Sequence, residues 1–197
     1  MAKPTTPVTA RGEQTRQNLL AAAEQEFGEK GFHTASISSI TQRAGVAQGT
    51  FYIYFASKED ILRALVRQMG RKVRHSLTEA TEAIPNRLEQ EKHGLEHFLK
   101  FAVEHKNLYR IVLESQFIDE SIHREYFETL VEMYAARLKK AQESDQIRKE
   151  DPFGQAWVLM GISYYLGLRY AMWEHRMPPD EVVETAKGFI ERGLRPD

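Results

Sequence analysis

The sequence predicts an all-α fold, with an N-terminal helix-turn-helix module of three helices and a larger C-terminal helical domain, about nine helices in all. Apolar residues recur at helical spacing along the chain, and no segment shows the sustained alternation of a β-strand. Two short helical patterns near the N-terminus are joined by a tight turn that contains glycine, as in a helix-turn-helix. With 197 residues and 42% apolar content, the chain is long enough to bury a hydrophobic core.

The ends of the expected helices are marked by capping residues, glycine and proline. Gly31 is placed to end the first helix, and Gly45 the second. Residues 57–60 resemble a capping box before an apolar stripe, and Asp151-Pro152 is a favourable N-cap and first-turn pair. The expected helices cover about residues 13–30, 36–44, 48–55, 57–83, 88–104, 107–115, 120–142, 151–175 and 180–194.

This order of helices divides the chain into four segments. Residues 1–12 are expected to be a disordered arm, and residues 13–56 the helix-turn-helix domain. Residues 57–83 form a connecting helix, and residues 84–197 the larger helical domain. No internal repeat or low-complexity segment interrupts this order.

Charge is distributed unevenly although the formal net charge is −1. Residues 1–75 carry eleven Lys and Arg against six Asp and Glu, whereas residues 76–197 carry sixteen against twenty-two. An anionic partner is therefore expected to meet the N-terminal part. The absence of cysteine excludes disulfides, thiolate nucleophiles and Cys-ligated zinc. The start of the chain lacks the apolar run of a signal peptide, so a cytoplasmic protein is expected.

The stretch from Gly45 to Leu62 combines a glycine-containing turn, four aromatic residues and a charged helix start. Phe51 and Phe55 lie four residues apart, so they share a helix face and are expected to pack in the core. A three-helix bundle without a ligand would show much of the same pattern. Two other faces carry side chains that can hydrogen-bond phosphates or base edges: Gln48, Thr50, Tyr52 and Tyr54.

Residues 31–62, GFHTASISSITQRAGVAQGTFYIYFASKEDIL, closely resemble the N-terminal module of the TetR/AcrR family of bacterial transcriptional regulators. The family pattern combines a Gly-aromatic pair, an Ala-Gly-Val turn, a Gly-Thr-aromatic-Tyr start and Lys-Glu before Leu or Ile. Thr41 stands where alanine is common, and Tyr54 where histidine or another aromatic residue often occurs. The matching positions are Gly31, Phe32, Ser36, Ile40, Ala44, Gly45, Val46, Gly49, Thr50, Phe51, Tyr52, Phe55, Lys58, Glu59 and Leu62.

The resemblance implies that the module binds double-stranded DNA. It implies a contact of Ser36 with the DNA backbone, and base contacts by Gln48 and Thr50. Tyr52 and Lys58 are expected to contact phosphates, which position a protein on DNA without specifying sequence. The full implied set is Ser36, Ala47, Gln48, Gly49, Thr50, Tyr52, Tyr54 and Lys58. Weaker candidates, expected to be solvated, are Arg43, Lys3 and Arg11.

The larger helical domain contains a run, residues 156–173, that is apolar nearly all round and carries one charge, Arg169. Such a helix must be buried on every side, and in a chain of this size a partner subunit most easily provides that burial. Arg169 and three tyrosines argue against a membrane span. TetR-like proteins dimerise through their last two helices, so the resemblance implies a homodimer with two reading helices on a palindromic operator.

The same domain is rich in aromatic residues, which line the core or a site for a hydrophobic or aromatic effector. Arg169 needs a partner, either a glutamate or an anionic ligand. The mechanism that the resemblance implies is a repressor released from its operator by the effector, although activation stays open. Acyl thioesters, aromatic acids, drugs and flavonoid-like compounds all remain open as effectors. The candidate effector residues are His97, Phe101, His105, Tyr109, Phe127, Trp157, Tyr165 and Arg169.

Two other functions compete with this interpretation. His93, Glu96 and His97 form an H-x-x-E-H pattern, which occurs in zinc hydrolases, and the two histidines share a helix face. No further ligand accompanies them, so we expect no enzyme, no metal and no cofactor. The second alternative is a helical interaction protein whose N-terminal module no longer reads DNA.

Overall fold

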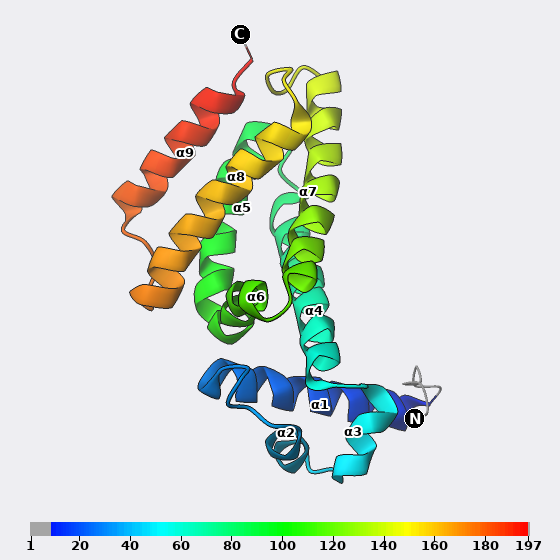
Figure 1. Cartoon of the computed structure of the whole chain (residues 1–197). Helices are drawn as coiled ribbons and strands as arrows, with labels where there is room; N and C mark the ends of the chain where they lie inside the picture. The colour runs from blue at the N-terminus through cyan, green and yellow to red at the C-terminus, as the bar shows by residue number, and fades with distance from the viewer. Residues whose placement is uncertain (1–8, 197) are drawn as a thin grey trace. The chain divides into compact units, whose positions relative to one another are not determined.

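The computed structural model describes residues 9–196, and within that range the chain forms helices and loops without β-strands (Figure 1). The all-α prediction is thereby confirmed. The helices are α1 (Ala10–Lys30), α2 (Ile37–Arg43), α3 (Gln48–Tyr54), α4 (Lys58–Thr81), α5 (Arg87–Glu104), α6 (Lys106–Ile118), α7 (Glu120–Glu143), α8 (Pro152–Gly167), a π-helical segment η1 (Leu168–Trp173) and α9 (Asp180–Leu194).

The first helix begins earlier than predicted. Thr9 is its N-cap, with the side-chain oxygen accepting a hydrogen bond from the Gly12 backbone N–H at 3.1 Å. Residues 10–12, predicted as part of the arm, are therefore helical. Residues 1–8 of the predicted arm, including Lys3, lie outside the described residues.

The chain forms two compact units, and neither is continuous in sequence. Of the described residues, the first unit contains 9–69 and 107–124, and the second contains 70–106 and 125–196. The predicted division was linear, with a boundary after residue 56. The structure instead groups most of α6 and the start of α7 with the N-terminal helices, and α4 contributes to both units.

In the first unit, α1, α2 and α3 pack around a common core (Figure 1). Gly45 lies in the turn between α2 and α3 with φ 69°, a left-handed conformation that costs an L-residue about 1–2 kcal/mol. Helices α2 and α3 can therefore approach each other through a short turn. The largest fully buried side chains of this core include Leu19, Phe27, Ile40, Phe51, Ile61, Leu62 and Leu65.

In the second unit, α5 packs against both α8 and α9. Apolar residues of these helices and of α7 share one core, in which Leu99, Leu138 and Ala156 are almost fully buried. The helix predicted to run to about residue 175 does not continue as an α-helix. It becomes the π-helical η1 after Gly167, where the Glu174 N–H donates to the Arg169 carbonyl at 3.0 Å, five residues back.

The run of residues 156–173 is not buried on every side by this chain. Trp157 is 49% exposed, Tyr165 70% and Trp173 69%. These large apolar surfaces, together with those of Phe153 and Phe189, are left uncovered by the described residues. No helix in the described range is both long and apolar enough to cross a membrane.

Candidate nucleic-acid interface

The α3 helix separates core side chains from outward-facing ones by angle. Phe51 and Phe55 are buried, with ring centroids 5.7 Å apart. Gln48 and Gly49 are exposed at the helix start, and Tyr52 is 46% exposed. The burial of the two phenylalanines and the exposure of Gln48 and Tyr52 agree with the prediction from helical spacing. No residue of α3 carries a formal charge.

Thr50 and Tyr54 are part-buried, so the third face of α3 is less open than the spacing predicted. Ala47, the N-cap, is exposed and makes no side-chain capping hydrogen bond. Its backbone and the first N–H groups of α3 therefore lie at an accessible helix start.

Sequence reasoning missed Ile53, which is 52% exposed on α3. It lies four residues after Gly49 and so shares that residue's outward face. The signal in the sequence that could have identified it is a β-branched residue placed between two tyrosines. Its aliphatic surface suits contact with a thymine methyl group.

The start of α2 is fixed by a reciprocal capping box between Ser36 and Ser39. The Ser39 N–H donates to Ser36 Oγ at 3.0 Å, and the Ser36 N–H donates to Ser39 Oγ at 3.1 Å. Ser36 is exposed, so the predicted backbone-contact residue lies at an ordered and accessible helix start.

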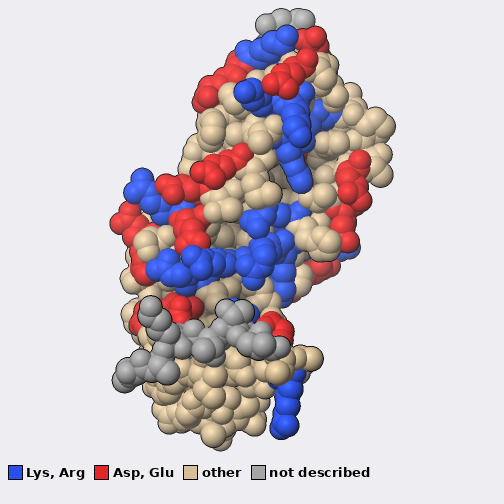
Figure 2. Space-filling model, turned by 90° about the vertical axis from the view of Figure 1, so that its right-hand side faces the viewer, with Lys and Arg blue, Asp and Glu red and all other residues tan. Residues whose placement is uncertain are grey.

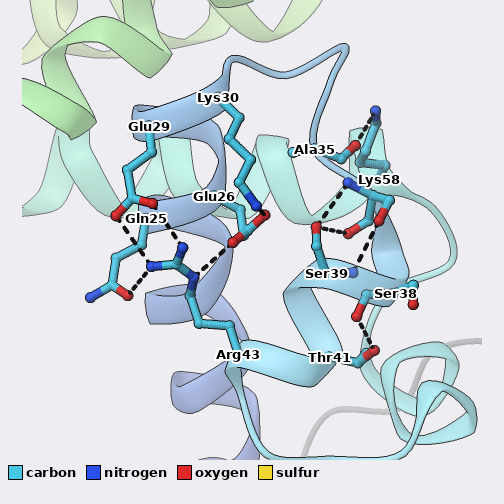
Figure 3. A network of polar contacts seen from close by, with 11 residues as sticks. Gln25, Glu26, Glu29, Lys30, Ala35, Ser38, Ser39, Thr41, Arg43 and Lys58 are labelled. Carbon is cyan, nitrogen blue, oxygen red and sulfur yellow. Dashed lines mark hydrogen bonds and ion pairs between the residues drawn. The ribbon is translucent and has the colours of Figure 1, made fainter.

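Arg43 is exposed, in agreement with the prediction, and it also joins α2 to α1 through ion pairs (Figure 3). Its Nε donates to Glu26 at 2.7 Å, and its Nη2 donates to Glu29 at 2.7 Å. Lys30 binds the other Glu26 oxygen at 2.8 Å, and Arg43 Nη1 also donates to Gln25 at 3.0 Å. We call these five residues the α1–α2 network. The partners of Arg43 precede it by 14 to 18 residues, so helical periodicity could not predict them.

Glu26 is the buried centre of the α1–α2 network, with only 2% of its side chain exposed. Its hydrogen bond with Lys30 is the main cause that lowers its pKa to about 2, with further lowering by Ser39 and Arg43. Burial acts in the opposite direction by disfavouring the charged form. Glu26 therefore remains ionised and holds α2 against α1 at neutral pH.

Lys58 is placed differently from the predicted phosphate contact. Its ammonium donates to the carbonyls of Phe32 at 2.7 Å and Ala35 at 2.8 Å, and lies 4.3 Å from the Phe32 ring centroid. These contacts tie the start of α4 to the loop that precedes α2 (Figure 3). The structure thus gives Lys58 a positioning role.

The capping sequence at residues 57–60 is largely as predicted. The Asp60 N–H donates to Ser57 Oγ at 3.2 Å, while the Asp60 carboxylate accepts from the Ala56 N–H at 3.0 Å. The return bond therefore reaches one residue further back than in a standard capping box.

Within the first unit, α6 packs closely against the end of α1. Arg110 Nη1 donates to the Gly28 carbonyl at 3.1 Å, and Glu114 accepts from the Phe32 N–H at 3.5 Å. A Cβ at Gly28 would come within 2.4 Å of the Asn107 side chain, so only glycine permits this approach. Sequence periodicity gave no indication of this contact.

The basic side chains on one face of the molecule are interspersed with acidic ones. On the face that Figure 2 shows, Lys and Arg side chains gather in clusters bordered by Asp and Glu. Several cations of the basic N-terminal third are engaged internally, as Lys30, Arg43 and Lys58 are. The excess positive charge of residues 1–75 therefore overstates what is available to an anionic partner.

The structure brings together only some of the predicted effector residues. Phe127 stacks on Trp157 at 6.3 Å, and Phe101 contacts His105 at 4.3 Å between ring centroids. Tyr109 is buried and belongs to the first unit, whereas the other seven belong to the second. Arg169 is exposed and pairs with Glu174 at 3.0 Å, which is the glutamate alternative for its partner. Tyr165 is exposed, and His97 lies 2.7 Å from Ser76 Oγ.

The H-x-x-E-H residues are not assembled as a metal site. His93 is exposed, Glu96 pairs with Lys187 at 2.9 Å, and His97 contacts Ser76. Within residues 9–196, no three His, Cys, Asp or Glu side chains gather closely enough to hold a metal ion.

The N-terminal region matches a known family. A family model described as "Bacterial regulatory proteins, tetR family" matches residues 19–65. YdgC of Bacillus subtilis, an uncharacterized HTH-type transcriptional regulator, is 44% identical over 71 residues, 36% of each chain. YvdT of Bacillus subtilis, with the same description, is 33% identical over 135 residues, 63% of each chain. The alignments thus span less than two thirds of these relatives' own lengths.

The whole chain is similar in fold to solved structures. The FadR regulator from Bacillus subtilis, solved in complex with stearoyl-CoA, has a TM-score of 0.77 and covers 90% of this chain and 98% of its own, at 20% identity. All three proteins are described as regulators. Residues 19–65 therefore match the TetR family of bacterial regulatory proteins, and the whole chain shares the fold of the FadR structure.

Proposed function

We propose that this protein is a DNA-binding transcriptional regulator whose α3 helix reads the operator. The observation that carries the proposal is the division of α3, in which Phe51 and Phe55 anchor the helix while Gln48, Tyr52 and Ile53 face outward. An α-helix fits the major groove of B-DNA, where glutamine can pair bidentately with adenine. The match of residues 19–65 to the TetR family model supports the same role.

The proposed roles follow from chemistry and accessibility. Gln48 and Thr50 read bases, Ile53 contacts a thymine methyl group, and Tyr52 donates to a phosphate. Ser36, Ala47, Gly49 and Tyr54 complete the interface through the helix starts and a second hydroxyl. Lys58 and the α1–α2 network act indirectly, because their bonds fix the loop and helix that precede α3.

We further propose a homodimer formed through α8 and α9. Its support is the uncovered apolar surface of Phe153, Trp157, Val158 and Phe189, which lies on these two helices. A two-fold dimer would present two α3 helices about 34–36 Å apart, which suits a palindromic operator. We include in the same proposal that the protein is a cytoplasmic repressor, because repression is usual in the TetR family.

The proposed effector is a hydrophobic or aromatic small molecule that binds the second unit. Support comes from its aromatic side chains and from the fold shared with a regulator that binds stearoyl-CoA. To change operator affinity tenfold, the effector must favour the non-binding state by about 1.4 kcal/mol.

The test is fluorescence anisotropy of the full chain with a duplex taken from beside its own gene and with an unrelated duplex. Gln48→Ala is expected to weaken binding to the first duplex by about 1–3 kcal/mol and to leave the unrelated duplex unaffected. Gln116→Ala, the same change at an exposed residue of α6, is the matched control and should leave both affinities unchanged. Equal binding of both duplexes by the unsubstituted protein would overturn the proposal.

A further inference from the structure

A cation and a phenol lie against the same point of α4 in the second unit. Arg74 is one turn beyond Gly70 on α4, and Tyr126 lies near the start of α7. A Cβ built on Gly70 would come within 3.3 Å of Arg74 Nη1 and 3.5 Å of carbons in the Tyr126 ring. The glycine thus allows the guanidinium and the ring to approach the helix together.

Neither polar group is satisfied by the protein. Arg74 is part-buried, yet it makes no ion pair or hydrogen bond with any residue of the described chain. Arg87, another part-buried arginine of this unit, pairs with the buried Glu91. The Tyr126 hydroxyl also lacks a hydrogen-bond partner in the described range. No polar atom of either side chain is among the buried unsatisfied atoms of the described residues, so both groups remain accessible to a partner from outside the chain.

The phenol of Tyr126 remains a hydrogen-bond donor across the physiological range. Burial raises its pKa above the usual value, while the nearby Arg74 guanidinium acts in the opposite direction. A protonated hydroxyl and a guanidinium are both donors, so together they suit an acceptor with negative charge.

The other edge of Tyr126 begins an aromatic cluster, which we define as Tyr126, Phe127, Trp157 and Tyr164. Tyr126 contacts Phe127 edge-on at 5.1 Å, and Phe127 contacts Trp157 at 6.3 Å and Tyr164 at 5.7 Å between ring centroids. Trp157 is 49% exposed, so the cluster extends from the unpaired donors to the surface of this unit.

We propose that Arg74 and Tyr126 bind the charged group of an organic anion whose apolar body lies on the aromatic cluster. The inference rests on the proposed effector response and narrows it, because it excludes neutral and cationic hydrophobes as the preferred class. The guanidinium can hold a carboxylate, phosphate or sulfonate bidentately, and the phenol adds a third donor. Arg169, the arginine predicted from sequence, is exposed and already paired with Glu174.

Two fluorescent probes separate charge recognition from apolar binding. 8-Anilinonaphthalene-1-sulfonate and N-phenyl-1-naphthylamine share the same aromatic body, and only the first carries a sulfonate. Arg74→Gln is expected to raise the Kd of the sulfonate at least tenfold and to leave the Kd of the neutral probe within twofold. Tyr126→Phe should raise the sulfonate Kd by a smaller factor, about threefold, since one hydroxyl is lost.

Arg71→Gln is the matched control, because it makes the same change at an exposed arginine of the same helix. It should leave both dissociation constants unchanged. If Arg74→Gln weakens both probes equally, or neither, the inference is overturned. A wild-type measurement guards against a variant that fails to fold: decanoate should displace the neutral probe at a lower concentration than 1-decanol, and equal displacement would overturn the inference.

Operator binding without any probe distinguishes this inference from the proposed function. Arg74→Gln should retain the operator affinity of the unsubstituted protein, because Arg74 lies outside the α2–α3 module. Loss of selective DNA binding by the unsubstituted protein would overturn the proposed function, whereas the probe affinities would still report on the anion site.

Discussion

The α2–α3 module and the α8–α9 region differ in whether their charged and large apolar side chains are paired or buried within the chain. In the module, Arg43 is paired with Glu26 of α1, and the large rings of Phe51 and Phe55 are buried. On α8 and α9, large apolar side chains such as Val158 and Phe189 remain exposed. The module is completed by its own chain, whereas the α8–α9 region has a surface suited to being completed by a second copy.

The largest effect is expected at the exposed surface of α8. Val158, which is 64% exposed, should be buried in the proposed dimer. Val158→Glu would place a charge in an apolar interface and weaken the dimer by about 3 kcal/mol, roughly a hundredfold. Light scattering coupled to size exclusion measures the oligomeric state. Met133→Glu, on α7, is the control and should not alter it.

Removing the buried centre of the α1–α2 network should strongly destabilise the module. Glu26→Ala leaves Arg43 and Lys30 without their buried carboxylate, and the expected loss is about 3 kcal/mol in the free energy of unfolding. Urea unfolding followed by circular dichroism measures this loss. Glu13→Ala, at an exposed acid of the same helix, should cost less than about 0.5 kcal/mol. Equal costs for the two variants would contradict a structural role for the network.

Acid should weaken the same network over a defined range. The pKa of Glu26 is about 2 in the folded protein against an ordinary value of 4.5. Its contribution to stability is therefore fully present above pH 4.5 and is lost as the pH falls towards 2. The Tm difference between the unsubstituted protein and Glu26→Gln should shrink across this range. A difference that stays constant from pH 7 to pH 2 would show that Glu26 does not contribute in this way.

A smaller effect is expected at the turn between α2 and α3. Gly45→Ala introduces a Cβ at a positive φ, although the space around it is open. The cost should be about 1–2 kcal/mol and arise from the backbone alone. Gly49→Ala, also in open space but at a position within α3 without a positive φ, is the matched control and should leave the free energy of unfolding nearly unchanged. Thermal unfolding of both variants checks the comparison.

The smallest effect is expected at Arg169, whose ion pair with Glu174 is on the surface. Arg169→Ala should leave the free energy of unfolding nearly unchanged, because exposed pairs are screened by water and salt. Its affinity for the anionic probe should be unchanged. A tenfold loss of probe binding would move the anion site from Arg74 to η1.

The sequence predicted those features that depend on local spacing. The helix order, the turn at Gly45 and the burial of Phe51 and Phe55 all follow from residues within a few positions of one another. What it missed depends on partners that are distant in sequence. The ion pair of Arg43 was missed because Glu26 lies 17 residues earlier, and the bonds of Lys58 were missed because its carbonyl partners lie 23 to 26 residues earlier.

The candidate effector site was predicted less completely for the same reason. Aromatic composition identified Phe127 and Trp157, which do contact each other. Arg74 was missed because α4 carries several basic residues, and its lack of an acidic partner is visible only once α7 is packed against it. Arg169 was favoured because it is alone in an apolar run, but Glu174 lies just beyond that run.

The absence of formal charge on α3 has a consequence for the thermodynamics of operator binding. Counterions are released from DNA when lysine or arginine neutralises phosphates, and the slope of log affinity against log salt concentration counts those contacts. Substitutions at Gln48 or Tyr52 should therefore lower the affinity at every salt concentration without changing the slope of log affinity against log salt concentration. In this protein the discrimination between sequences and the response to ionic strength would be adjustable independently, since different elements of the chain determine them.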